Sequence, residues 1–210
     1  VSHFLSNCGI DFGDKRDFID TTLHKHNPIF FELEWVNQLN DRVFEALGGS
    51  WDDNRLPLSG DFSASCLEPL RVEAREKLRS YWPDAPRFGI KDPRFCFTLP
   101  FWQEVLADNH CDVRLVWSLR RMAAVIESNR AVNGWELDRV RRFIAESTLS
   151  CRYMVANSDC VYLDYDSMVS NPLEFAADST RRLGFLDVDP NHAVSHIQPA
   201  IRHNLSGKST

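Results

Sequence analysis

The stretch from Val113 to Arg130, VRLVWSLRRMAAVIESNR, constrains the fold of this chain more than any other segment. An apolar run from Val113 to Trp117 predicts a buried strand, and the residues after Arg120 predict a helix. A strand that leads directly into a helix is typical of α/β proteins with a parallel sheet. Arg120 then lies at the carboxyl end of the strand, which is where open α/β sheets bind their ligands.

Arg120 and Ser128 together are suited to bind an oxyanion such as phosphate or sulfate. The guanidinium offers a planar fork of donors, and the Ser128 hydroxyl lies two helical turns further on and adds a donor without adding charge. A structural interpretation explains the same residues: Arg120 caps the strand end, and Ser128 lies on a polar helix face. The segment by itself leaves both interpretations open.

The rest of the chain alternates between helical spacing and short apolar runs. Strands separated by helices imply a parallel sheet that is covered on both faces, so we expect an α/β fold. Residues 48–63 and 191–210 have the composition of loops. The predicted helices are an N-terminal helix closed by Gly9, Trp35 to Leu47, Leu67 to Leu78, Val140 to Met154 and Pro172 to Gly184, and the other predicted strands are Phe88 to Ile90 and Val161 to Tyr165.

Composition indicates one globular domain that spans residues 1–210, with 43% hydrophobic and 26% charged residues. The net charge of −6 argues against nucleic acid or an anionic membrane as a partner. No transmembrane run or signal peptide is recognisable, so we expect a cytoplasmic protein. The six cysteines lack the spacing of a metal site and are expected to be reduced and mostly buried.

A second group of cations follows the predicted strand at Phe88 to Ile90, in the motif FGIKDPR. Pro93 cannot continue a strand, so the chain should present Lys91 and Arg94 at the same edge of the sheet as Arg120. An ion pair of Asp92 with either neighbour is the structural alternative.

The ordered motifs resemble those of sulfotransferases that use 3′-phosphoadenosine 5′-phosphosulfate (PAPS) as sulfuryl donor. The resemblance extends from about Phe4 to His203 and is closest to the bacterial-type members, which have a P-loop-like α/β fold. It implies a three-layer parallel sheet flanked by helices. The motifs are NPIFFE (Asn27 to Glu32), GGSWD (Gly48 to Asp52), KDPRFCFTLPFW (Lys91 to Trp102), LRRMAAVIESNR (Leu119 to Arg130), YDSMVSNP (Tyr165 to Pro172) and IQPAIRH (Ile197 to His203).

The resemblance implies that Arg120 and Ser128 hold the 3′-phosphate of the nucleotide donor. Arg130 matches a basic residue of the same motif, and it either supports the phosphate or pairs with a carboxylate. The family usually has proline two residues after the strand-end arginine, where this chain has Met122. The site as a whole would take PAPS as co-substrate and would need no metal ion.

The resemblance also implies catalytic roles for Lys91 and Glu32. Lys91 would stabilise the sulfuryl oxygens or the bridging oxygen of the leaving phosphate. Glu32 would be the base for the acceptor hydroxyl, with His24 and His26 as rivals, while an ordinary acid in the first turn of a helix is the alternative interpretation of Glu32. Further contacts to a small-molecule or carbohydrate acceptor are expected from Arg94, His26 and Arg202.

One element of the family has no counterpart in this sequence: the first strand with its Gly-rich turn, which wraps the 5′-phosphosulfate. Val1 to Gly9 corresponds to the helix that should follow this turn, so we expect the natural protein to begin further upstream. Two functions are therefore considered. The chain belongs either to a PAPS-dependent sulfotransferase or to a non-catalytic relative that binds nucleotide or serves as a scaffold.

Overall fold

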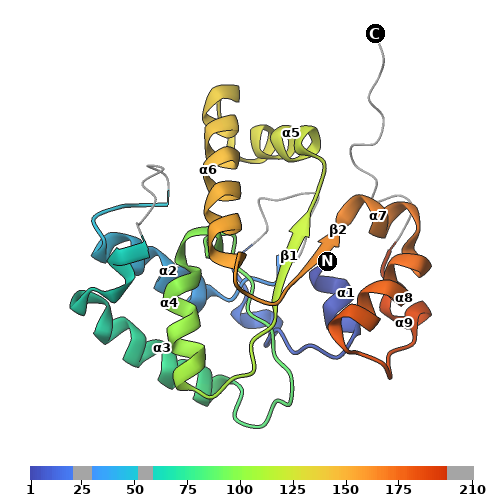
Figure 1. Ribbon diagram of the computed structural model, residues 1–210, viewed down its shortest axis with the longest axis horizontal. Helices are drawn as coiled ribbons and strands as arrows, with labels where there is room; N and C mark the ends of the chain where they lie inside the picture. Colours follow the sequence, from blue (N-terminus) through green and yellow to red (C-terminus); the bar gives the residue numbers. More distant parts are fainter. Residues whose placement is uncertain (21–29, 52–58, 198–210) are drawn as a thin grey trace. The chain divides into compact units, whose positions relative to one another are not determined.

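The computed structural model describes residues 1–20, 30–51 and 59–197, and within them the chain has a mixed α/β structure (Figure 1). Most of the described residues lie in helices, and the two strands form a short parallel sheet. The elements are α1 (Ser2–Asn7), η1 (Lys15–Asp17), α2 (Glu34–Ala46), η2 (Ser59–Ser63), η3 (Ser65–Leu67), α3 (Glu68–Tyr81), α4 (Phe95–Asp108), β1 (Leu115–Leu119), α5 (Met122–Asn133), α6 (Leu137–Val155), β2 (Cys160–Asp164), α7 (Tyr165–Ser170), α8 (Pro172–Leu183) and α9 (Pro190–Ala193).

The helices predicted from apolar spacing are confirmed as α1, α2, α3, α5, α6 and α8. Their ends agree with local chemistry. In α8, Pro172 occupies the first helical position, where its missing N–H costs nothing, and Gly184 ends the helix in the left-handed conformation with φ 76°.

Helix α4 was not predicted, because its prolines obscure the helical pattern. Pro93 precedes the helix and Pro100 lies inside it, where proline removes one hydrogen bond of the backbone. Burial compensates for this loss: Phe97, Phe101 and Trp102 are each less than 5% exposed, and they recur at helical spacing.

The sheet of the described residues consists of β1 and β2, which run parallel from the pair Leu115 and Cys160 to the pair Leu119 and Asp164. The strand predicted from Val161 to Tyr165 corresponds to β2, which ends one residue earlier, at Asp164. The Asp164 carboxylate accepts a hydrogen bond from the Ser167 amide at 2.6 Å and thereby caps α7, which begins at Tyr165.

The predicted strand from Phe88 to Ile90 is wrong. Phe88 forms only an isolated parallel bridge with Asp11, in which the Gly89 amide donates to the Asp11 carbonyl at 2.8 Å. A strand is stabilised by a partner along its length, and this pairing covers a single position before the chain turns into α4.

In the described residues β1 is less buried than expected, and the sheet covered on both faces stays a prediction. Val116 and Leu119 are 36% and 37% exposed. The buried cluster around α1, α8 and α9 includes Val161 and Leu163 of β2 but no residue of β1. β1 pairs with one strand and contributes no residue to this cluster, so apolar side chains of β1 stay exposed in the described residues.

The expectation of mostly buried cysteines is wrong, because Cys8 is the one buried cysteine of the six.

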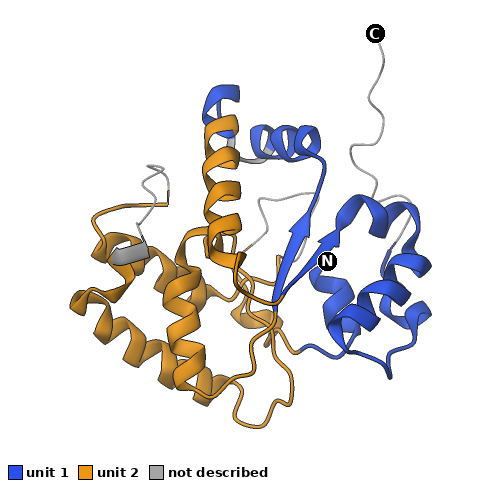
Figure 2. Cartoon of the chain, viewed as in Figure 1, with its two compact units in different colours: residues 1–10, 115–140, 160–210 blue, residues 11–114, 141–159 orange. Residues whose placement is uncertain are grey.

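The described chain divides into two compact units (Figure 2). Unit 1 comprises residues 1–10, 115–140 and 160–210, and unit 2 comprises residues 11–114 and 141–159. Each unit interleaves segments that are distant in sequence, so neither is a continuous stretch that could be separated as a domain. The single domain over residues 1–210 therefore stays a prediction.

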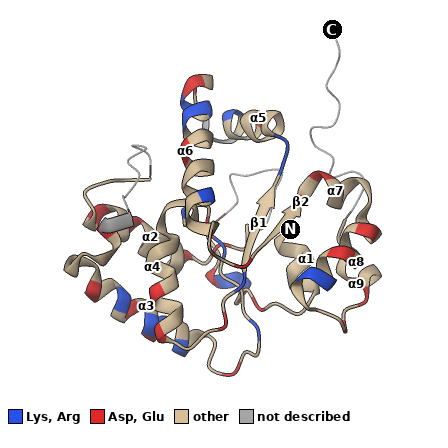
Figure 3. Ribbon diagram, viewed as in Figure 1, with Lys and Arg blue, Asp and Glu red and all other residues tan. Residues whose placement is uncertain are grey.

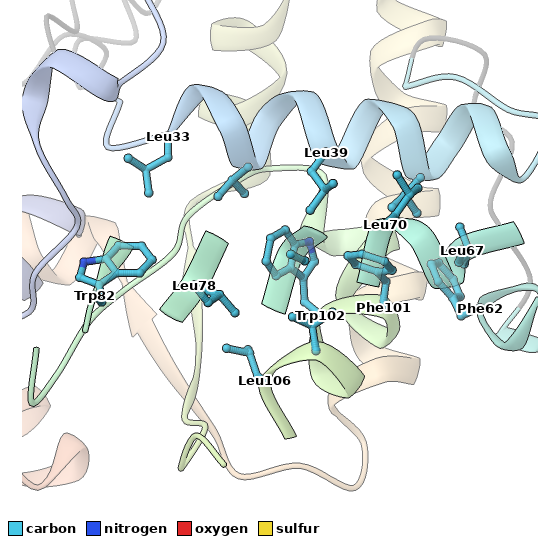
Figure 4. Packing of buried hydrophobic residues seen from close by; sticks show 14 residues of the cluster. Leu33, Leu39, Phe62, Leu67, Leu70, Leu78, Trp82, Phe101, Trp102 and Leu106 are labelled. Atoms are coloured by element: carbon cyan, nitrogen blue, oxygen red, sulfur yellow. The ribbon is translucent and has the colours of Figure 1, made fainter. Parts of the chain in front are cut away.

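Each unit has a hydrophobic core of its own. In unit 1, Phe4 of α1 is fully buried and packs edge to face on Phe175 of α8, with ring centroids 5.1 Å apart. In unit 2, α2, α3 and α4 enclose a larger cluster that includes Leu39, Leu78 and Trp102 (Figure 4). Within the part of the chain that the structure describes, no helix is both long enough and apolar enough to cross a membrane.

Candidate functional site

Arg120 lies at the point where two chain segments leave the sheet side by side. It follows β1 directly, and Tyr165 follows β2 at the equivalent position, since Leu119 pairs with Asp164 in the parallel register. The centre of the Arg120 guanidinium lies 4.9 Å from the centroid of the Tyr165 ring. This cation–π contact places the guanidinium at the carboxyl edge of the sheet, as the sequence predicts.

The neighbouring arginine is neutralised, whereas Arg120 is not. Asp166 accepts a hydrogen bond from the Arg121 amide at 2.9 Å, and its carboxylate lies 3.5 Å from the Arg121 Nε. Among the described residues no carboxylate pairs with Arg120, and its Nε is buried without a hydrogen-bond partner. Figure 3 shows the basic segment between β1 and α5. We call Arg120, Arg121, Tyr165 and Asp166 the Arg120 cluster.

Ser128 and Arg130 both lie on α5, the helix that Arg121 caps. The Ser128 side chain is half-buried, and its hydroxyl has no hydrogen-bond partner within the described residues. Arg130 is exposed in the last turn, where a cation is favoured by the helix dipole. No described carboxylate forms an ion pair with Arg130, so the alternative of a structural ion pair receives no support.

Lys91 and Glu32 form an ion pair in unit 2. The Lys91 ammonium donates a short hydrogen bond to Glu32 Oε1, although the two residues are 59 positions apart. Glu32 is 6% exposed, whereas the Lys91 side chain is 39% exposed. Burial raises the pKa of Glu32, and the Lys91 charge opposes this rise only in part.

The interpretation of Glu32 as an acid in the first turn of a helix is wrong. Helix α2 begins at Glu34, which occupies that position, and Glu32 precedes the N-cap residue Leu33. Glu32 is instead positioned by Phe31, which has the left-handed backbone value φ 56°. Such a conformation is strained for a bulky residue and persists only where the surroundings hold it.

Aromatic packing holds Phe31 in this conformation. Its ring lies 5.3 Å from that of Phe12 and 5.6 Å from that of Phe18, measured between centroids. The Ile19 amide also donates to the Glu32 carbonyl at 2.9 Å. The sequence does not indicate this support, because a pair of adjacent phenylalanines carries no signal for a positive φ.

Arg94, the N-cap residue of α4, forms ion pairs with two carboxylates. Its Nε donates to Asp41 at 2.7 Å, and its Nη1 lies 3.4 Å from Asp92 Oδ1, which also accepts from the Arg94 amide at 2.7 Å. The guanidinium lies 5.1 Å from the Trp51 ring centroid. Burial raises the pKa of Asp92, while Arg94 opposes the rise. The ion pair between Asp92 and Arg94 is thus observed. We call Glu32, Asp41, Lys91, Asp92 and Arg94 the Lys91 cluster.

The predicted site residues therefore fall into two groups. Unit 1 carries Arg120, Ser128 and Arg130, and unit 2 carries Glu32, Lys91 and Arg94. His26 and Arg202 lie outside the described residues. Among residues 1–20, 30–51 and 59–197, no group of three or more His, Cys, Asp or Glu side chains could hold a metal ion.

No family model, curated protein or solved structure matches this chain. A functional assignment therefore depends on the Arg120 cluster, the Lys91 cluster and the order of the sequence motifs.

Proposed function

We propose that this chain is a sulfotransferase that moves a sulfuryl group from PAPS to a hydroxyl or amine of a small molecule or carbohydrate. The observation that carries the proposal is the Arg120 guanidinium, which lies over the Tyr165 ring at the end of β1 and has no carboxylate partner among the described residues. An arginine with a purely structural role is normally paired when it is partly buried. An unpaired guanidinium beside an aromatic ring is suited to receive an oxyanion.

Arg120, Ser128 and Arg130 are proposed to bind the 3′-phosphate of the donor. The Arg120 fork would make the charge-assisted hydrogen bonds, and the Ser128 hydroxyl would add a neutral one. Arg130 is exposed in the last turn of α5 and would add long-range attraction rather than a fixed contact. Asp166 supports this division of roles, because it neutralises Arg121 and leaves Arg120 available.

Glu32 and Lys91 are proposed to act on the reacting groups. Glu32 would accept the proton of the acceptor hydroxyl. The oxygen of that hydroxyl would attack sulfur while the bond from sulfur to the phosphate oxygen breaks. Lys91 would neutralise the charge that develops on that oxygen, and 3′-phosphoadenosine 5′-phosphate (PAP) would leave. The buried position of Glu32 suits a base, since it brings the pKa closer to neutrality.

One ammonium group can serve both Glu32 and the leaving group. Lys91 has three N–H donors, and the bond to Glu32 uses one of them. Its side chain is 39% exposed, so the remaining donors are accessible to a bound molecule. Sulfuryl transfer of this kind relies on positioning and charge neutralisation, and the proposal includes no metal ion.

The proposal extends to the fold and the setting of the protein. β1 and β2 are taken as two strands of a three-layer, P-loop-like parallel sheet, and the exposed apolar side chains of β1 are compatible with further neighbours. The protein would act in the cytoplasm, without nucleic acid or membrane as a partner.

Calorimetric titration with PAP tests the donor site. The unsubstituted chain should bind PAP, and Arg120→Ala should weaken binding by about 10- to 100-fold, because charge-assisted hydrogen bonds to the phosphate are lost. Arg121→Ala is the matched control and should change affinity by no more than about threefold, since Arg121 is exposed and already paired. Equal losses in the two variants, or no binding of PAP at all, would contradict the proposal.

A transfer assay separates the enzyme from a non-catalytic nucleotide-binding relative. PAPS labelled in the sulfuryl group is supplied with a panel of phenols, amines and sugars, and labelled product is measured. Turnover should occur with at least one acceptor, and Glu32→Gln should lower it at least about 100-fold without changing PAP affinity. Binding of PAP without turnover on any acceptor would favour the non-catalytic alternative.

A further inference from the structure

One face of helix α6 carries an apolar stripe that is exposed to water. Leu149 and Tyr153 are 66% and 71% exposed, and Ala145 is exposed as well. The three residues follow one another at intervals of four, so their side chains lie in a row along the helix. Exposed apolar side chains that adjoin one another mark interaction surfaces, whereas single ones are ordinary.

Two arginines lie beside the stripe. Arg142 is seven residues before Leu149 and Arg152 is three residues after it, which places both on the same side of the helix. Both are exposed, and neither forms an ion pair with a carboxylate of the described residues. Figure 3 marks basic positions along α6. We call Arg142, Ala145, Leu149, Arg152 and Tyr153 the α6 patch.

The charge of the α6 patch is opposite to that of the whole chain. Glu146 is the one acid between residues 141 and 155, and it is partly buried rather than exposed. The patch is therefore basic, although the chain has a net charge of −6. A partner that complements it must supply apolar side chains and, next to them, negative charge.

Another side of α6 packs within unit 2, to which the patch residues also belong. The Phe143 ring lies 5.1 Å from the Trp51 ring and 6.2 Å from the Phe97 ring of α4, measured between centroids. These contacts hold the helix in place before any partner arrives. A preformed helical face loses little conformational entropy on binding, which favours association.

We propose that the α6 patch binds an acidic amphipathic helix of a partner protein. Apolar side chains of that helix would cover Leu149 and Tyr153, and its Asp or Glu residues would pair with Arg142 and Arg152. Tyrosine and arginine are the residue types that often dominate the binding energy of protein interfaces. This surface does not depend on the proposed sulfuryl transfer.

Two other occupants fit the α6 patch less well. A second copy bound through the same face would bring arginines together without an exposed acid to pair with them. An anionic membrane would gain only two large apolar side chains, and the net charge of −6 would oppose its approach. An acidic helix matches both the row of apolar side chains and the charge beside it.

Fluorescence anisotropy with two labelled synthetic peptides tests the proposal on the whole chain. The first is a helical peptide of about 18 residues with leucines at intervals of three and four and glutamates beside them. The second has lysine in place of each glutamate. The glutamate peptide should bind at least about 10-fold more tightly than the lysine peptide, and rising salt should reduce this ratio.

Matched variants locate the binding of the glutamate peptide. Arg142→Gln combined with Arg152→Gln should weaken it about fivefold and remove most of its salt dependence. Leu149→Ser combined with Tyr153→Ser should weaken it at least about 10-fold. The controls are Arg181→Gln and Leu186→Ser, because both residues are exposed but lie outside the patch, and they should leave the affinity unchanged.

All of these positions are exposed, so the variants should unfold at the same temperature as the unsubstituted chain. Absence of binding by the glutamate peptide, equal affinity for both peptides, or equal losses in the control variants overturns the proposal. So does binding to phosphatidylserine vesicles, or self-association in sedimentation, that the same patch variants abolish.

Discussion

The Lys91 and Arg120 clusters contain cations that look alike in the sequence but differ in their state of pairing. Lys91, Arg94 and Arg120 all come near the end of a short apolar run. In the structure, Lys91 pairs with Glu32, and Arg94 pairs with Asp41 and Asp92. Arg120 rests on an aromatic ring and has no carboxylate partner among the described residues. The position of a cation in the sequence therefore does not establish that it is available to a ligand.

The difference arises from residues that are distant along the chain. Glu32 is 59 positions from Lys91, and Asp41 is 53 positions from Arg94. Both acids flank or belong to α2, and the packing of α2 against the start of α4 brings them to the cations. Among residues 1–20, 30–51 and 59–197 no acid pairs with Arg120, and Asp166 is held by the Arg121 amide and side chain.

The largest effect should come from removing a cation from each cluster in turn. Arg94→Ala should lower the free energy of unfolding by about 3–5 kcal/mol, because it leaves Asp92 buried without a counter-charge. Arg120→Ala should lower it by less than about 1 kcal/mol, since it removes only the contact with Tyr165. Urea denaturation measures the free energy of unfolding of both variants. Equal losses of this free energy would contradict the difference in pairing between Arg94 and Arg120.

An intermediate effect should appear in the pH dependence of stability. Glu32 titrates with a pKa raised above 4.5, so between 4.5 and the raised pKa the unfolded chain loses its proton first. Stability from this group is therefore highest at low pH and declines as the pH rises through that window. Glu32→Gln should remove this part of the decline.

Urea midpoints of the unsubstituted chain and of Glu32→Gln, measured across the acid range, test this sign. Asp92 also titrates with a raised pKa, and its charge helps to raise the pKa of Glu32, so the difference between the two proteins includes the coupling of these two carboxyls. Asp166→Asn is the control, because it also replaces a carboxylate by an amide, but at a partly exposed position of the Arg120 cluster. A difference between the chain and Glu32→Gln that grows in the opposite direction would show that Lys91, rather than burial, dominates the titration of Glu32.

The smallest effect concerns the aromatic support of Arg120. Tyr165→Leu should weaken PAP binding by about two- to fivefold, because it removes a cation–π contact that orients the guanidinium. Tyr165→Phe keeps the ring and should bind like the unsubstituted chain. Calorimetric titration distinguishes the two. Equal weakening in both variants would instead point to a role of the Tyr165 hydroxyl.

Helices were predictable in this protein where their signal is local. The apolar spacing of α2 and α3 and the Pro172 and Gly184 ends of α8 follow from backbone chemistry within a few residues. Helix α4 escaped prediction because Pro100 interrupts a pattern that burial then overrides. The run from Phe88 to Ile90 failed as a strand because its pairing with Asp11 covers one position.

Candidate site residues were predictable by type but not by environment. The sequence motifs identified Glu32, Lys91 and Arg120 as groups with suitable chemistry, and each carries a feature that only the fold supplies. Phe31 orients Glu32 through a positive φ, which no local pattern signals for phenylalanine.

The amino-acid sequence by itself determined the α/β character of this protein, the positions of the helices with a regular apolar spacing, and the kinds of side chain that follow the strands. These properties depend on periodicity and capping, which act over a few residues. Only the tertiary structure decided which cations are neutralised and which carboxylate is buried. Ion pairing and burial each require two segments to come together, and that depends on how the helices pack.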